Sequence, residues 1–373
     1  DKINGELVAL TWLLAASLSA LIGVIQYFGW AHALYPWISQ TGLGEAFANL
    51  RQRNQFATLT SIGLVALIAL RAQQLTLQPK LSGLILLVLL ALGNAASGSR
   101  TGLLQWLLIP TLSAWWFWPK QREALVFSLQ AVLAHRGAVL SLPWLLEWMT
   151  GTHSNGLFGR LVESTGCSSR KILWSNVLTL ISQKPWLGWG WGELDYAHFI
   201  TLYPGERFCE ILDNAHNLPL HLAVELGIPA ALTICGMFTW LVWKGKPWDE
   251  IDPIRQMAWG VLAVIGLHSL LEYPLWYGPF QMATGLSIFL LYTRKKNHRM
   301  NIVNLVNLVN LVNLVSKDKN NGLLFLFKPA LFALLSRLML AVVVAILVGT
   351  ALRYQQVSQI YLTPAERNPA YRD

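Results

Sequence analysis

Long apolar runs recur along the whole chain, and they constrain its fold more than any other feature of the sequence. A helix needs about 20 apolar residues to cross the hydrocarbon layer of a membrane. A backbone in lipid must also satisfy its own hydrogen bonds, which makes helices the default for such runs. The candidate spans lie at 7–28, 56–71, 81–97, 101–118, 124–149, 216–243, 256–276, 278–293 and 322–350. We therefore predict an all-α integral membrane protein, a polytopic helical bundle of about nine spans.

Composition separates this class from soluble alternatives. Hydrophobic residues make up 54% of the 373 positions and charged residues only 13%, a balance outside the range of soluble domains. The formal net charge of +9 could suggest a nucleic-acid partner. The basic residues, however, form short clusters between apolar runs rather than one polar face. We therefore expect membrane lipids, and no nucleic acid, as partners. Because the chain begins with Asp1 rather than Met, we expect the natural product to be longer.

The basic clusters also predict the orientation in the membrane, because short loops rich in Lys and Arg stay in the cytoplasm. Alternating the loops places these clusters on one side: Arg71 with Lys80, Lys120 with Arg122, Lys244 with Lys246, and Arg294 to Arg299. The opposite side receives the segments 29–55, 97–100, 150–215 and 277–279 and the tail after 350. This side is predicted to be the periplasmic face of a bacterial inner membrane.

The same alternation divides the chain into six regions. These are the spans of 1–149, a periplasmic loop 150–215, spans within 216–293, a cytoplasmic low-complexity loop 294–321, a span at 322–350 and a periplasmic tail 351–373. The 150–215 loop is too long for a passive connector, so we expect the chemistry there. Asn-Leu-Val triplets repeat between 301 and 315, and we interpret them as a neutral expansion.

Two of the three cysteines fall in the long loop. An oxidising periplasm permits a disulfide between Cys167 and Cys209, whereas two unpaired thiols are the alternative. Cys235 lies inside a span, where it is an ordinary apolar residue.

Several arginines map to the predicted outer face against the usual charge bias. They are Arg51, Arg53, Arg100, Arg160, Arg170 and Arg207. Because a guanidinium offers a planar fork of donors to phosphate oxygens, such a cluster suits a lipid diphosphate. Contacts with lipid headgroups or loop salt bridges are the alternative. Arg136, in the middle of the fifth span, is either a functional charge within the membrane or a sign of a misplaced boundary.

His216 stands where the long loop enters the sixth span. An imidazole can accept a proton from a hydroxyl at neutral pH, so His216 is a candidate general base. The alternative is a helix cap or an interface residue. On an unbroken helix His221 and Glu225 face away from it, and Glu225 is expected to pack against another helix.

A second polar pair consists of His268 and Glu272, four residues apart and predicted to share a helix face. The pair either braces two helices or contacts substrate. Trp276 and Tyr277 follow and suit the interfacial aromatic belt. No metal-ligand spacing, nucleotide-binding loop or serine-nucleophile motif is present, so we expect no metal or cofactor and disfavour ATP-driven transport.

Five segments, taken in order, resemble the PglL-type bacterial protein O-oligosaccharyltransferases within the wider O-antigen ligase and polymerase superfamily. They are 51–57, 97–102, 170–174 with 185–190, 216–220 with 225–227, and 268–277. The first and the last are similar to the protein-glycosylating branch more than to the lipopolysaccharide ligases. The family has further spans before residue 1 and a larger soluble region after the last span.

The resemblance implies an undecaprenyl-diphosphate-linked glycan as donor and a Ser or Thr hydroxyl of a periplasmic protein, often a type IV pilin, as acceptor. His216 matches the essential loop histidine of the family. Arg100 and Arg170 match positions that hold the diphosphate, and Arg53 is expected to join them. The resembling segments also supply candidates for supporting or substrate-binding roles: Gln52, Asn54, Gln55, Asn217, Glu225, His268, Glu272 and Tyr277.

On this reading His216 deprotonates the acceptor hydroxyl while the arginines neutralise the departing diphosphate, without a metal and with inversion at the anomeric carbon. A ligase or polymerase that uses a sugar hydroxyl as acceptor is the first alternative. A transporter or flippase is the second, but it would need charges spread through the spans.

Overall fold

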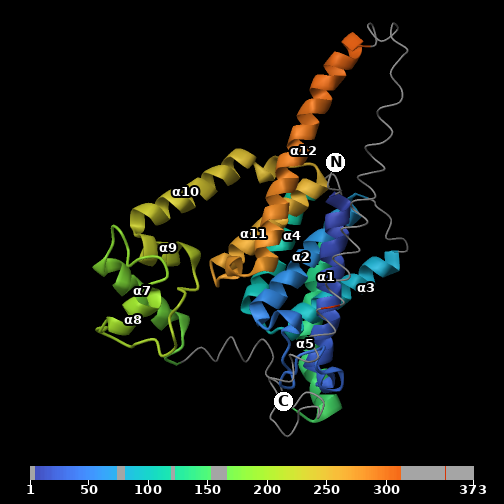
Figure 1. Cartoon of the computed structure of the whole chain (residues 1–373). Coiled ribbons are helices and arrows are strands. Elements are labelled where there is room, and N and C mark those ends of the chain that lie inside the picture. The colour runs from blue at the N-terminus through green and yellow to red at the C-terminus, as the bar shows by residue number, and fades with distance from the viewer. Residues whose placement is uncertain (1–4, 74–79, 119–121, 153–165, 312–348, 350–373) are drawn as a thin grey trace. The chain divides into compact units, whose positions relative to one another are not determined.

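Helices form all of the regular structure in the residues that the computed structural model describes, which are 5–73, 80–118, 122–152, 166–311 and 349. No strand occurs within these ranges, and the all-α prediction is confirmed for them (Figure 1). The ninth predicted span, at 322–350, lies outside the described residues except for Gly349.

Five helices make up the N-terminal part of the chain. They are α1 (Gly5–Tyr27), α2 (Arg53–Ala72), α3 (Lys80–Ala96), α4 (Arg100–Phe117) and α5 (Arg122–Thr150), with the short 3₁₀ turns η1 (Trp30–Leu34) and η2 (Ala48–Leu50) between α1 and α2. Each lies within a few residues of a predicted span, because apolar runs end where polar or Gly-containing segments begin.

The remaining described helices follow the predicted long loop or lie within it. They are α7 (Arg170–Gln183), α8 (Leu194–Ile200), α9 (Leu218–Leu226), α10 (Ile228–Gly245), α11 (Pro253–Ser269) and α12 (Gly278–Leu311), with the 3₁₀ turns η3 (Pro247–Asp249) and η4 (Pro274–Trp276).

The chain divides into two units. The first takes in the described residues up to Lys295 apart from 34–37, and it contains every residue of the candidate site. The second consists of 34–37 and the chain from Lys296 onward, whose described part includes the end of α12. Helix α12 runs through the first Asn-Leu-Val triplets, as far as Leu311.

Among the residues that the structure describes, four helical segments are long and apolar enough to cross a membrane: Gly5–Tyr27, Arg53–Ala72, Arg122–Thr150 and Ile228–Asp249. Helix α3 contains a shorter apolar stretch, Leu81–Ala96. These lengths match the thickness of the hydrocarbon layer and indicate a membrane protein.

Helix α2 is the centre of the N-terminal bundle, because it packs against α1, α3, α4, α5 and α11. Its large apolar side chains, including Phe56, Ile62 and Leu64, are almost completely buried. Gly63 permits the close approach of α1, since a Cβ at this position would lie 2.3 Å from the Cβ of Ala16. Helix α2 is thereby held firmly within the bundle.

The structure differs from prediction at two predicted spans. The sixth is broken at Gly227, whose φ of +87° ends α9 before Pro229 opens α10. The seventh ends at Ser269 rather than 276, and Pro274 then begins the short turn η4.

The long loop has an ordered core of its own where it is described. Leu173, Val177 and Leu180 of α7 pack with Leu194 of α8 and Val224 of α9. This part of the loop is therefore a small helical subdomain that can hold side chains in place.

Candidate active site

Three segments predicted to face the periplasm and the outer end of the predicted seventh span meet around one open pocket of about 720 Å³. Its lining residues are Phe47, Arg51, Gln52, Arg53, Asn54, Gly98, Ser99, Arg100, Thr101, Arg170 and Glu272. They come from the loop before α2, the turn before α4, the start of α7 and the chain after α11. Three arginines that sequence reasoning assigned to a diphosphate, Arg53, Arg100 and Arg170, thus share one pocket.

These three arginines are each the first residue of a helix. Arg53 begins α2, Arg100 begins α4 and Arg170 begins α7. Free backbone N–H groups and the helix dipole make each N-terminus favourable for anions. A cation at this position costs about 0.3–1 kcal/mol. Helix stability therefore does not explain three arginines at these positions. An anionic ligand in the pocket does explain them.

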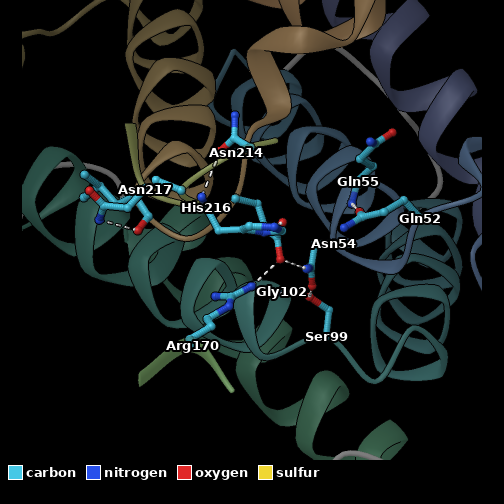
Figure 2. A network of polar contacts seen from close by, with 12 residues as sticks. Gln52, Asn54, Gln55, Ser99, Gly102, Arg170, Asn214, His216 and Asn217 are labelled. Carbon is cyan, nitrogen blue, oxygen red and sulfur yellow. Dashed lines mark hydrogen bonds and ion pairs between the residues drawn. The ribbon is translucent and has the colours of Figure 1, made fainter. Parts of the chain in front are cut away.

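Polar caps fix where these helices begin. The side chains of Gln52, Ser99 and Ser169 accept hydrogen bonds from N–H groups in the first turns of α2, α4 and α7. Ser99 also donates to Asn54 Oδ1 at 2.6 Å, which joins the start of α4 to the start of α2 (Figure 2). Gln55 is buried and donates its backbone N–H to Gln52.

The three arginines differ in their partners. Arg53 forms an ion pair with Glu45 at 2.5 Å. Arg170 forms one with Glu272. Arg100 is exposed and makes no ion pair with any residue that the structure describes. It is therefore the cation best placed to be neutralised by a ligand.

Glu272 connects the arginine pocket to His216. Its Oε1 accepts hydrogen bonds from Arg170 and, at 3.1 Å, from Asn54 Nδ2, whereas its Oε2 lies 2.5 Å from His216 Nδ1. Burial alone would raise the pKa of Glu272, but the hydrogen bond to His216 and the charges of His216 and Arg170 lower this pKa below its ordinary value. The carboxylate therefore stays ionised at neutral pH.

His216 is held in an unusual backbone conformation, with φ at +50°. A left-handed conformation costs energy for a residue with a side chain, so the surrounding contacts must enforce it. Asn214 Oδ1 accepts the His216 N–H at 2.8 Å (Figure 2). Asn217 caps α9 and donates to the carbonyl of Leu270 at 2.9 Å, which ties this segment to the end of α11.

The imidazole of His216 is arranged as a base. An ionised Glu272 accepts a hydrogen bond from the Nδ1–H group of His216. The proton of the neutral imidazole is therefore on Nδ1, and Nε2 carries a free lone pair. Nε2 makes no hydrogen bond to any described residue, and 26% of the side chain is exposed. Tyr273 packs edge-on against the ring at 5.0 Å and stacks on Tyr277 at 5.9 Å. Tyr277 thus supports the ring that contacts His216.

His268 does not line the pocket. The prediction that it shares a helix face with Glu272 was wrong, because α11 ends at Ser269, between the two residues. His268 Nδ1 is 2.8 Å from Thr58 Oγ1 of α2, and Thr58 accepts from Gln105 of α4 at 2.9 Å. His268 is 1% exposed. This polar network joins three packed helices, which is consistent with a brace.

Glu225 also lies outside the pocket. Its Oε1 accepts the Gly192 N–H at 3.0 Å, and its Oε2 is 3.6 Å from His221 of the same helix. Burial raises the pKa of Glu225. Its polar partners are thus a turn and its own helix, and the expectation that it packs against another helix stays a prediction.

Of the other outward arginines that the structure describes, Arg51 lines the pocket and Arg207 does not. Arg207 donates to the carbonyls of Thr201 and His198. Arg136 is exposed on α5, and Arg160 lies outside the described residues.

The two loop cysteines form a disulfide between Cys167 and Cys209, with the Cα atoms 5.5 Å apart. It ties the chain just before α7 to the segment that leads to His216. Trp174 of α7 adds a second link by donating to the carbonyl of Ala215 at 3.1 Å. Arg170 and His216 are therefore positioned by the same subdomain.

We predict that this disulfide is present in the purified protein. On the chain-entropy model, closing a loop of this length contributes roughly 3–4 kcal/mol. Alkylation in denaturant without reductant should leave two thiols protected in the intact mass. A mass showing three alkylated cysteines would contradict the bridge.

Sequence reasoning missed Ser99 and Asn214 as supports of the site. Both were visible as small polar residues directly before a predicted helix or a candidate base, which are the positions of caps and side-chain turns. Their partners, however, are set by contacts between distant segments.

Comparisons with known proteins match the three parts of the chain that build this site. A family model described as O-Antigen ligase matches residues 85–235, one described as Protein glycosylation ligase matches 46–70, and one described as Virulence factor membrane-bound polymerase, C-terminal, matches 256–373. The resemblance predicted from the sequence is confirmed.

Individual relatives of the chain carry names of the same kind as these family models. A General O-oligosaccharyltransferase of Acinetobacter baylyi is 25% identical over 74% of this chain and 48% of its own length. A ComP-specific O-oligosaccharyltransferase of the same organism is 26% identical, covering 76% and 52%. An O-antigen ligase of Pseudomonas aeruginosa is 28% identical, covering 62% and 48%. The chain spans about half the length of the curated relatives it matches.

Proposed function

We propose that this protein transfers a glycan from an undecaprenyl-diphosphate carrier to a Ser or Thr hydroxyl of a periplasmic protein, such as a type IV pilin. The observation that carries the proposal is the pocket at which α2, α4 and α7 all begin with an arginine, joined through Glu272 to His216. The pocket suits a diphosphate because it combines guanidinium groups with helix N-termini. The names of the relatives supply the class of reaction.

We assign a role to each group. His216 Nε2 removes the hydroxyl proton as the acceptor oxygen bonds to the anomeric carbon, and Glu272 stabilises the resulting imidazolium through Nδ1. The bond between the anomeric carbon and the diphosphate oxygen breaks, and the electron pair leaves on the diphosphate. The arginines neutralise that charge. A single displacement inverts the anomeric centre.

Transfer to a sugar hydroxyl is the second candidate. It is supported by the O-Antigen ligase family model over 85–235 and by the relative of that name. Donor and base would be unchanged, and only the acceptor would differ. Export by a transporter has less support, because Arg136, the charge predicted within a span, is exposed on α5 rather than lining the pocket.

The proposal is tested by coexpressing the complete gene with a candidate pilin and a lipid-linked glycan and then weighing the pilin intact. A pilin heavier by the mass of the glycan supports protein glycosylation. Unmodified pilin together with newly glycosylated lipid or longer polysaccharide would favour the second candidate.

We also propose the predicted topology, with nine spans and the regions 1–149, 150–215, 216–293, 294–321, 322–350 and 351–373 as assigned from the sequence. Contacts within the first unit support it. The pocket gathers three segments assigned to the periplasm and the outer end of the predicted seventh span. Residues at the predicted cytoplasmic side also meet, since Trp116, near the end of the predicted fourth span, donates to the carbonyl of Pro247 and Arg294 pairs with Asp252.

Cysteine labelling in intact cells checks this topology. Single cysteines at positions 40, 160 and 200 should react with an impermeant reagent. Those at 80, 121, 245 and 297 should react only after the inner membrane is broken. Labelling of position 160 only in broken cells would contradict both the topology and the placement of the site.

Conservative changes at the arginines should weaken donor binding. We expect Arg100→Lys and Arg170→Lys each to lower kcat/KM by about 10–100-fold, because an ammonium keeps the charge but loses the two-pronged contact to phosphate oxygens. Arg207→Lys is the matched control outside the pocket. The readout is pilin mass against donor concentration at equal membrane amounts. A normal KM for the donor in both pocket variants would contradict the diphosphate assignment.

A further inference from the structure

A tryptophan-rich turn precedes α8, and three of its large apolar side chains point into open space. In this turn, residues 185–192, Trp186 is 76% exposed, Leu187 is 85% exposed and Trp191 is 73% exposed. Trp189 instead faces inward, donating to the carbonyl of Leu180 at 2.9 Å. Clustered apolar exposure of this kind marks an interaction surface.

The turn is fastened to the junction of α9 and α10 by its backbone. Three hydrogen bonds join them: Trp189 N to Val224 O at 2.9 Å, Gly190 N to Glu225 O at 2.9 Å, and Ile228 N to Pro185 O at 2.8 Å. The approach is so close that a Cβ on Gly227 would lie 2.2 Å from the carbonyl oxygen of Trp186. The turn therefore cannot move independently of the start of α10.

Helix α10 begins the segment Ile228–Asp249, which is apolar and long enough to cross a membrane. Its first turns continue the apolar surface, with Ile228 40% exposed and Leu232 69% exposed. An apolar turn locked to the start of such a helix must lie at the depth where that helix enters the lipid. Tryptophan is enriched at this depth because its ring is amphipathic.

We propose that the tryptophan-rich turn inserts into the outer leaflet at the boundary between headgroups and acyl chains and anchors the helical subdomain to the lipid surface. This rests on the topology proposed above, with the sixth span beginning at Ile228 rather than at 216 because α9 ends at Gly227, so that the start of α10 lies at the periplasmic face. Lipid is the favoured occupant because the exposed surface is continuous with that of a candidate span.

The anchor has a consequence for the site. The turn holds one end of α9, and His216 lies just before the other end, about 14 Å away for a helix of 9 residues. The turn would thereby limit how far His216 can move relative to the lipid surface.

Spin labelling tests the proposal without requiring turnover. Leu187→Cys is made in the complete chain carrying Cys235→Ser, labelled with a nitroxide and reconstituted in phosphatidylethanolamine and phosphatidylglycerol vesicles. Because Leu187 is so exposed, the substitution should not disturb packing. Collision rates are measured with oxygen, which concentrates in acyl chains, and with a water-soluble nickel complex.

The control is Glu206→Cys, an exposed position in a polar turn of the same subdomain. We expect the ratio of oxygen to nickel collisions to be several-fold higher at 187 than at 206. Equal ratios would overturn the proposal, because the turn would then face water. Low collision rates with both reagents at 187 would also overturn it, because protein rather than lipid would cover the turn. Either result would leave the transferase proposal standing.

Discussion

His216→Ala should abolish most glycan transfer, with a loss on the order of 10²–10⁴-fold in kcat, because it removes the proposed proton acceptor. The arginines remain, so binding of the lipid-linked donor should stay close to normal. The measurement is the rate of pilin mass increase at matched membrane amounts, together with donor binding to the purified protein.

His221→Ala is the matched control. His221 is the neighbouring histidine, buried against Trp276 rather than exposed at the pocket. Burial lowers its pKa to about 4, so it is neutral at physiological pH. We expect near-normal turnover per folded molecule. If His216→Ala glycosylates at the normal rate while His268→Ala does not, the base has been assigned to the wrong histidine.

Glu272→Gln should cause the second large loss. The carboxylate accepts hydrogen bonds from His216, Arg170 and Asn54. An amide in its place cannot neutralise the positive charges of Arg170 and of a protonated His216. The amide oxygen can still accept from Nδ1, but without the negative charge the imidazolium is no longer stabilised, so kcat should fall by up to the full contribution of the base, on the order of 10²–10⁴-fold. Arg170 would also lose its anchor, so the KM for the donor should change as well.

Glu225→Gln distinguishes catalysis from folding. Glu225 is also a buried carboxylate near a histidine, but it supports the 185–192 turn. Each variant leaves buried polar groups less well paired, which should lower the free energy of unfolding by about 1–3 kcal/mol. Both variants should therefore show lower thermal stability. Only Glu272→Gln should lower turnover per folded molecule. Equal turnover in the two variants would show that Glu272 is a structural brace.

The membrane class, the helical architecture and several of the residues that the structure brings together around the pocket could be predicted from the sequence. Apolar runs need only local information, because lipid demands that each backbone segment satisfy its own hydrogen bonds. Arg100 and Arg170 stood out because cations are uncommon on the outer face, and His216 because it stood at a boundary between loop and helix.

Tertiary structure alone decided how these residues act together. Glu272 was predicted to pair with His268 on one helix face, but the helix ends between them. Glu272 thus reaches His216, 56 residues away in sequence, and Arg170, 102 residues away. The convergence of α2, α4 and α7 at one pocket was equally invisible. Such contacts depend on packing between helices, which hydrophobic periodicity along one segment does not encode.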